Sequence, residues 1–183
     1  MLDYRLENEL NEAGYTAICG VDEAGRGPLC GPVAAAACIL PVGLVLDGLN
    51  DSKKLSAKKR DLLFDQIREN ALAYCVALGS VEEINNTDIL SATLHAMRRA
   101  IEGLQVRADF ALVDGNITRG FTLPARAVVH GDAISPNIAA ASILAKVTRD
   151  RICLELDRLY PQYGIAKHKG YGTKEHMDEI GRA

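Results

Sequence analysis

Four acidic residues share one context, a position at or just beyond the end of a short apolar run of the kind that forms a strand: Asp22, Glu23, Asp114 and Asp132. Acids at the ends of neighbouring strands can converge, and converging carboxylates repel one another unless a cation neutralises them. Oxygen ligands of this kind suit Mg²⁺ or Mn²⁺. Two such ions, roughly 4 Å apart, can activate a water and stabilise the leaving oxygen when a phosphodiester is cleaved. The pattern favours a metal site, although each acid taken alone is better explained as a turn former or helix cap.

A glycine-rich stretch follows the first two acids. Gly25, Arg26 and Gly27 let a backbone approach a ligand without interference from a Cβ atom, and free amides beside a guanidinium suit a sugar hydroxyl or a phosphate. The alternative is a degraded dinucleotide-binding fingerprint, with Asp47 as the partner of a ribose. Prolines within the stretch weaken that alternative, because they remove amides and prevent a helix from beginning there.

Basic residues are concentrated in two parts of the chain, at 53–60 and after Asp132. Charge alone favours two solvated helix faces, but Lys53, Lys146 and Lys169 are candidates for phosphate contacts that position a duplex. Tyr171 stands between glycines and near Lys169, which suits stacking on a sugar or base. A buried core tyrosine flanked by turn glycines explains that segment equally well.

The composition bounds the class of protein. A chain of 183 residues with 48% hydrophobic residues has the length of one ordinary domain, so we expect a single domain over residues 1–183, with a short helical segment from about 160. We expect neither a membrane span nor a secretion signal. Five scattered cysteines indicate neither a disulfide framework nor a zinc site, so a cytoplasmic setting is expected. The net charge of −3 argues weakly against bulk electrostatic coating of nucleic acid.

The pattern of apolar residues and breaks predicts strands separated first by a structured loop and then by helices. The expected strands are 17–21, 33–40, 72–78, 109–113 and 125–129. The expected helices are 57–69 with Ser56 as N-cap, one from 86 or 87 to about 104, one from Pro136 toward Leu159 with Ser135 as N-cap, and a short one over 173–180. This order predicts an α/β protein with a mixed sheet covered by helices.

Taken together, six segments resemble the type 2 ribonucleases H, in particular the bacterial ribonuclease HII family. The segments are 20–28 (GVDEAGRGP), 50–56 (NDSKKLS), 113–116 (VDGN), 131–132 (GD), 139–150 (AAASILAKVTRD) and 168–171 (HKGY). Their order and spacing match as well, over about residues 17–180, and the first and last segments together are highly specific.

The resemblance implies a ribonuclease H-like mixed sheet flanked by helices, with Asp22, Glu23, Asp114 and Asp132 as metal ligands. It implies that residues 25–27 sense the 2′-hydroxyl of a ribonucleotide, as discrimination of RNA from DNA at one position requires, and that Tyr171 packs on the adjoining deoxyribose. The implied reaction is cleavage on the 5′ side of a ribonucleotide in an RNA/DNA hybrid or in duplex DNA with an embedded ribonucleotide. It leaves a 3′-hydroxyl and a 5′-phosphate.

For the roles of the acids we hypothesise that Asp22 and Asp114 hold the ions, while Glu23 and Asp132 complete the shell and help to orient the attacking water. The protein is expected to be a monomer. Two features depart from the family: Asn137 stands where a small residue or serine is usual, and relatives commonly continue with a basic tail beyond the last residues seen here. Two rivals remain, a non-catalytic nucleic-acid-binding module of the same fold and an oxidoreductase that binds a dinucleotide through Gly25 to Gly31.

Overall fold

The computed structural model describes residues 2–50 and 52–182, so Asp51, part of one of the six motifs, lies outside the described residues. The strands are β1 (Ile18–Ala24), β2 (Val33–Ile39), β3 (Ala73–Gly79), β4 (Phe110–Asp114) and β5 (Ala125–Val128). The helices are α1 (Arg5–Glu12), α2 (Ala57–Asn70), α3 (Val81–Asn86), α4 (Ile89–Glu102), α5 (Pro136–Leu159), α6 (Ile165–His168) and α7 (Lys174–Ile180). Short 3₁₀ turns lie at η1 (Ser52–Lys54), η2 (Gly131–Ala133) and η3 (Pro161–Tyr163).

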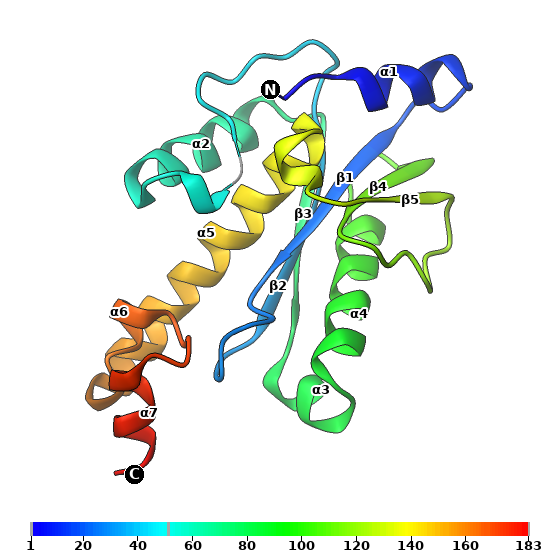
Figure 1. The fold of residues 1–183 in the computed structure, drawn as a ribbon. Coiled ribbons are helices and arrows are strands. Elements are labelled where there is room, and N and C mark those ends of the chain that lie inside the picture. The colour runs from blue at the N-terminus through cyan, green and yellow to red at the C-terminus, as the bar shows by residue number, and fades with distance from the viewer. Residues whose placement is uncertain (1, 51, 183) are drawn as a thin grey trace.

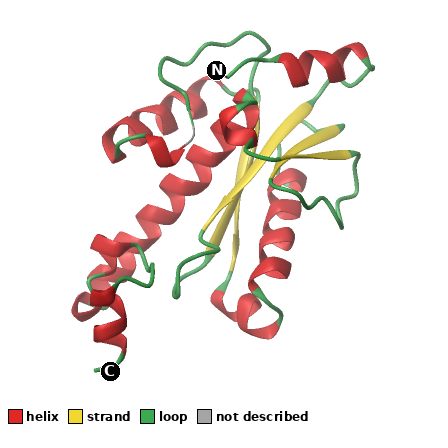
Figure 2. Cartoon of the chain, in the orientation of Figure 1, coloured by secondary structure: helices red, strands yellow, loops and turns green. Residues whose placement is uncertain are grey.

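One sheet organises the described residues, with strand order β3-β2-β1-β4-β5 (Figure 1). The three early strands pair antiparallel, whereas β1, β4 and β5 run parallel. Helices cover both faces, as the helix and strand colours of Figure 2 show. The prediction of a mixed sheet flanked by helices is therefore confirmed.

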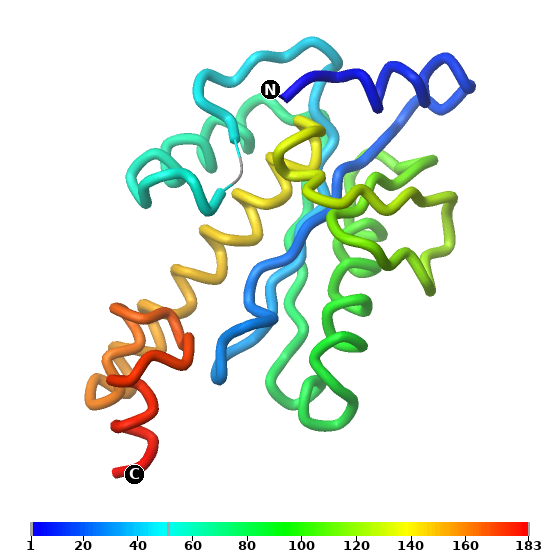
Figure 3. Tube along the Cα trace, in the orientation of Figure 1, coloured from blue at the N-terminus to red at the C-terminus, as the bar shows by residue number. Residues whose placement is uncertain are grey.

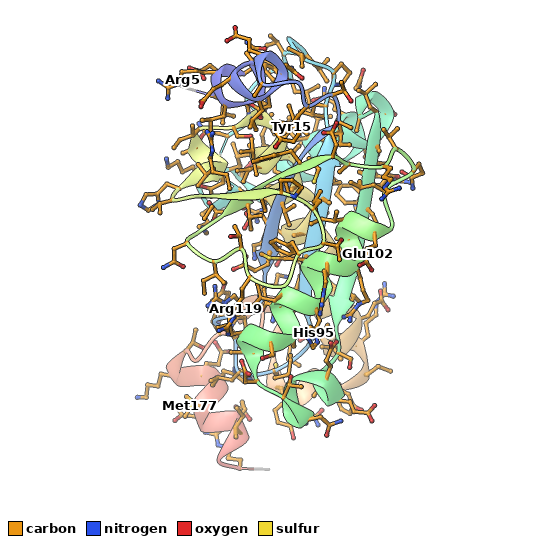
Figure 4. All side chains as sticks on the ribbon, turned by 90° about the vertical axis from the view of Figure 1, so that its right-hand side faces the viewer. Arg5, Tyr15, His95, Glu102, Arg119 and Met177 are labelled. Atoms are coloured by element: carbon orange, nitrogen blue, oxygen red, sulfur yellow. The ribbon has the colours of Figure 1, made fainter. Side chains whose placement is uncertain are left out.

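The alternation of β2 shows how the two faces differ. Ala35 and Ala37 pack in a core with residues of α4, whereas Ala36 and Cys38 pack with residues of α2 and α5. Successive strand residues point to opposite faces, so the small side chains of this strand leave room for a helix on each side. Figure 4, which looks onto α4, shows His95 near the middle of that helix and Glu102 at its C-terminal end, in front of the sheet.

The helix α5 approaches β1 more closely than an ordinary side chain would allow. A Cβ atom added at Gly20 would lie 2.1 Å from the carbonyl carbon of Asn137 and 2.2 Å from the amide nitrogen of Ile138. Ser135 caps the helix by accepting from the amide of Ile138, and Pro136 is its first residue, as predicted. Gly20 lies two residues before Asp22, so this contact holds the acidic end of β1 against α5.

Asn137 takes part in this contact as a buried brace. Its side-chain oxygen accepts from the amide of Leu40 at 3.0 Å and its side-chain nitrogen donates to the carbonyl of Ile18 at 2.9 Å. With only 2% of its surface exposed, it joins α5 to β1 and to the end of β2. The departure at Asn137 therefore supplies packing and hydrogen bonds within the fold.

The structure differs from the predicted elements in four places. Helix α1 was not predicted, although Leu6 and Leu10 are spaced as on one face of a helix, and neither was α6. The helix predicted from 86 or 87 begins at Ile89 with Asp88 as its N-cap, behind the separate α3. The strand predicted to end at Val21 continues to Ala24. None of the helices within residues 2–50 and 52–182 is both long and apolar enough to cross a bilayer.

Candidate acidic site at the end of the sheet

Three of the four acids lie where the pairing of β1 with β4 ends. The last pair joins Val21 to Val113, so Asp22 and Asp114 are the next residues on the two parallel strands. Asp22 and Glu23 were predicted to follow a strand, and this was wrong. They lie inside β1, because its antiparallel pairing with Ala36 and Ala35 of β2 continues past the end of the parallel pairing.

Asp22 is almost completely buried, with 4% of its surface exposed. One carboxylate oxygen accepts from the amide of Glu23 at 2.7 Å. Burial raises the pKa of Asp22 well above its ordinary value, and the negative charges of Glu23 and Asp114 raise it further. A hydrogen bond from Ser142 of α5 opposes that rise only in part. The site therefore holds more negative charge than its surroundings accommodate.

Glu23 faces the side of the sheet that α4 covers. It lines a small cavity of about 30 Å³ together with Asp114 and with Leu94 and Met97 of α4. Burial raises the pKa of Glu23, and Asp114 adds to the rise, while Arg26 lowers it. The Arg26 guanidinium lies 3.4 Å from the Glu23 carboxylate. Neighbouring residues of one strand thus place the two carboxylates on opposite faces, with Asp114 close to both.

Asp114 and Asp132 are joined through the backbone of η2. Asp114 accepts from the amide of Gly131 at 2.7 Å. A Cβ atom at Gly131 would lie 3.3 Å from that same carboxylate oxygen. Asp132 follows directly, with 4% of its surface exposed, and its carboxylate lies 3.6 Å from the ammonium of Lys53. The fourth acid therefore reaches the same end of the sheet, accompanied by a lysine.

Side chains that sequence reasoning missed support the acids from α5 and η1. Besides its bond to Asp22, the hydroxyl of Ser142 lies 2.9 Å from that of Ser52, and both serines are buried. Ser52 begins the 3₁₀ turn that carries Lys53. The sequence signal was a polar residue directly after an alanine run on a buried helix. These two serines connect the carboxylate of Asp22 to the turn beside Asp132.

The donors suit a hard divalent cation, since they are all carboxylate oxygens. Within residues 2–50 and 52–182, however, no three His, Cys, Asp or Glu side chains are already arranged to hold a metal ion. The Arg26 guanidinium and the Lys53 ammonium stand beside two of the carboxylates. The crowding that raises the pKa of Asp22 is what a divalent cation would relieve, so the donor chemistry of these residues fits a metal.

The glycine-rich loop lies against the segment that carries Tyr171. A Cβ atom at Gly27 would lie 3.3 Å from the Tyr171 ring, and the amide of Leu29 donates to the carbonyl of Gly170 at 2.8 Å. The Cα trace in Figure 3 shows the β1–β2 connection beside the C-terminal segment. Tyr171 is 46% exposed, so the alternative of a buried core tyrosine is wrong. The dinucleotide fingerprint is also wrong, because β1 leads to an antiparallel strand and not to a helix.

The three candidate phosphate-binding lysines have different surroundings. Lys53 is 76% exposed beside Asp132. Lys146 is only 19% exposed and forms an ion pair with Asp150 at 2.7 Å. Lys169 is partly exposed in the left-handed conformation, with φ of 52°, directly before the segment of Gly170 and Tyr171. Lys53 and Lys169 therefore lie beside predicted site residues, whereas Lys146 is engaged within the protein.

Comparison with known sequences gives a consistent result. The profile of the family described as Ribonuclease HII matches residues 19–183, a range that contains all four acids and Tyr171. A ribonuclease HII of Desulfitobacterium hafniense is 54% identical over 178 residues, which are 97% of this chain and 68% of that protein. One from Albidiferax ferrireducens is 59% identical over 160 residues, 87% of this chain and 77% of that protein.

Solved structures agree on the fold. Ribonuclease H2 from Pyrococcus horikoshii OT3 superposes with a TM-score of 0.71 at 25% identity, covering 90% of this chain and 85% of that one. The ribonuclease HII of Archaeoglobus fulgidus, solved as a complex with PCNA, gives a TM-score of 0.72 at 27% identity, with coverage of 89% and 84%. The predicted ribonuclease H-like fold is confirmed.

Proposed function

Because this chain belongs to the ribonuclease HII family and is therefore a hydrolytic ribonuclease, we propose that it cleaves beside ribonucleotides within a duplex. The bond hydrolysed is the phosphodiester on the 5′ side of a ribonucleotide, in an RNA/DNA hybrid or embedded in DNA. The products carry a 3′-hydroxyl and a 5′-phosphate. The reaction depends on Mg²⁺ or Mn²⁺, with two ions during catalysis.

The observation that carries this proposal is the crowding of carboxylates around Asp22. Burial and the charges of Glu23 and Asp114 raise its pKa, and a divalent cation held by these carboxylates would offset the repulsion among them. Such ions would supply an activated water and stabilisation of the leaving oxygen. Asp22 and Asp114 would hold them, while Glu23 and Asp132 complete the shell.

The remaining residues bind and orient the substrate. Residues 25–27 contact the 2′-hydroxyl, and Tyr171 packs on the adjoining deoxyribose. The closeness of Gly27 to the Tyr171 ring supports this assignment, because it places a residue without a side chain next to a tyrosine that is 46% exposed. Lys53, Lys146 and Lys169 contact phosphates, which requires Lys146 to leave Asp150. We further propose that residues 1–183 form a single catalytic domain that acts as a monomer.

Cleavage of defined duplexes tests the proposal. The protein is incubated with a DNA duplex that carries one ribonucleotide, with a continuous RNA/DNA hybrid and with an all-DNA duplex, each with Mg²⁺, Mn²⁺ or a chelator. We expect metal-dependent nicks 5′ of the ribonucleotide and none in the all-DNA duplex. Tight binding to the same duplexes without any metal-dependent nick would instead identify a non-catalytic binding module.

A further inference from the structure

A buried arginine connects the two segments that the proposed function assigns to the substrate. Arg149 lies in α5 and only 1% of its surface is exposed. Its guanidinium donates to the carbonyls of Cys30 and Pro32 at 3.1 and 3.3 Å, both in the β1–β2 connection. It also donates to the carbonyl of Lys169 at 2.8 Å, two residues before Tyr171. One planar group thus holds backbone atoms from both segments.

The geometry of this contact shapes the glycine-rich loop itself. Gly25 has a φ of +116°, and a Cβ atom there would lie 2.5 Å from Nε of Arg149. Glycine is the residue that combines this backbone conformation with so close an approach. The backbone at Gly25 therefore passes directly against the guanidinium, and the hydrogen bonds to Cys30 and Pro32 hold the rest of the connection that carries residues 25–27.

The second segment is held in a conformation that its residues do not favour. Lys169 adopts the left-handed region, which costs energy for a residue with a side chain and persists where surrounding contacts determine it. Arg149 binds its carbonyl, and the amide of Leu29 binds the next carbonyl, that of Gly170, at 2.8 Å. Both contacts come from outside the segment, and together they fix the position of the backbone directly before Tyr171.

Stability alone does not explain an arginine at this position. Within the described parts of the chain, the Arg149 side chain donates to the three carbonyl oxygens and to the Cys153 sulfur, and all of these acceptors are neutral. Burying a charge is expensive, and apolar residues of similar volume often stabilise such a position better. The fork of donors, which matches several acceptors at once, is what arginine adds.

We propose that Arg149 is a positioning residue for substrate selectivity: it holds residues 25–27 and Tyr171 as one unit, so that a ribose and the deoxyribose next to it are recognised together. This rests on the proposed function, which makes those two segments substrate contacts. Arg149 itself lies beneath them, and its role is to fix the spacing between them.

The test compares Arg149→Lys with Arg151→Lys, a matched control on the same helix whose side chain is 51% exposed and paired with Asp61. For each protein, kcat/KM is measured on a duplex with one embedded ribonucleotide and on a continuous RNA/DNA hybrid. Lysine keeps the charge but cannot reach three carbonyls. The ratio is kcat/KM on the duplex with one embedded ribonucleotide divided by kcat/KM on the continuous hybrid. We expect this ratio to fall about tenfold or more in Arg149→Lys, and to remain that of the unaltered protein in Arg151→Lys.

The ratio separates positioning from simple instability, because a lower folded fraction reduces both constants equally. Mn²⁺ affinity, measured by calorimetry, is expected to be unchanged. An unaltered ratio in Arg149→Lys, or a loss of Mn²⁺ affinity with it, would overturn the proposal. If the unaltered protein shows no metal-dependent cleavage on either duplex, it is the proposed function that fails.

Hydrogen exchange of the unaltered protein provides a test that needs no variant to fold. The amides of Leu29, Gly170 and Tyr171 are all hydrogen-bonded, the first across the two segments and the others within the second. If Arg149 makes one unit of them, the three amides open together with a common free energy. Separate opening of the Leu29 amide, with a free energy of its own, would contradict the proposal.

Discussion

At the scale of single residues, the chain keeps a buried carboxylate whose environment opposes its charge. Asp22 would be easier to bury as a neutral group, and its raised pKa expresses this. Because the pKa of Asp22 is higher in the folded than in the unfolded protein, protonation of Asp22 stabilises the folded state. This stabilisation is present below the unfolded-state pKa and is lost as the pH rises through the folded-state pKa. Without metal, Asp22 should therefore destabilise the protein at neutral pH.

Asp22→Asn is expected to lower metal-dependent cleavage by orders of magnitude while raising the thermal midpoint of the metal-free protein by a few degrees near neutral pH. The gain should shrink as the pH falls, because Asp22 becomes protonated and neutral in the parent protein. Thermal unfolding with a chelator between acidic and neutral pH measures this. The control is Asp47→Asn, which changes a fully exposed carboxylate. A folded Asp22→Asn protein that still cleaves would remove Asp22 from the metal site.

At the scale of elements, the site depends on how closely α5 lies against β1. Gly20→Ala is expected to lower the free energy of unfolding by about 3 kcal/mol, because the new methyl group would meet backbone atoms that cannot move independently of the helix. Urea unfolding gives the value. Gly181→Ala is the matched control, since its Cβ atom would find ordinary contact at 3.5 Å. Equal effects of the two substitutions would show that α5 can move away.

A second prediction concerns the other end of the parallel strands. Asp109 accepts from both the amide and the hydroxyl of Thr16 and from the amide of Ala17. Partial burial alone would raise its pKa, but these hydrogen bonds outweigh it, so the pKa is lowered. The stabilisation is then present above the unfolded-state pKa and is lost as the pH falls through the lower folded-state pKa.

Asp109→Asn should accordingly destabilise the protein by about 1 to 2 kcal/mol at neutral pH, with the difference disappearing in strong acid. Urea unfolding at a series of pH values measures it. Asp61→Asn, which alters an exposed pair with Arg151, serves as the control. A difference between Asp109→Asn and the parent protein that persists unchanged into strong acid would contradict the assigned role of the ionised carboxylate.

Most strands and long helices could be predicted because their signals are local. Ser56 and Ser135 are recognisable caps, and the apolar spacing of α4 is visible in the sequence. The extent of β1 was missed because pairing with a partner strand, and not the residues of β1, determines where it ends. The acids were found because their context repeats. The buried role of Arg149 has no local signal, since its three carbonyl partners are scattered along the chain.

At the scale of the whole molecule, the N-terminal and C-terminal helices lie far apart, and only the C-terminal segment lies beside the glycine-rich loop. Arg5 of α1 and Met177 of α7 lie at opposite ends (Figure 4), with the sheet between them. The net charge is −3, so long-range attraction to a polyanion is weak and binding must come from a few local contacts. The candidates beside the acids are Lys53 and Arg26, with Lys146 and Lys169 as the further proposed contacts.

This local character can be measured through the salt dependence of binding. Each phosphate contact that a basic side chain makes contributes about 0.9 to the slope of log K against log salt concentration for a duplex. Lys53→Gln should therefore weaken binding of a duplex with one ribonucleotide and reduce the slope by about one, whatever the base sequence. Binding is measured by fluorescence anisotropy in a chelator, so that cleavage does not interfere.

The control removes an equal charge from the opposite end of the sheet. Arg107 is exposed and precedes the start of β4, whereas Asp114 ends that strand. Arg107→Gln changes the net charge as Lys53→Gln does, so an effect of overall charge would appear equally in both. We expect the slope to change only for Lys53→Gln. Equal changes in the slope would show that duplex binding depends on the total charge of the molecule. The proposed contact between Lys53 and a phosphate would then be wrong.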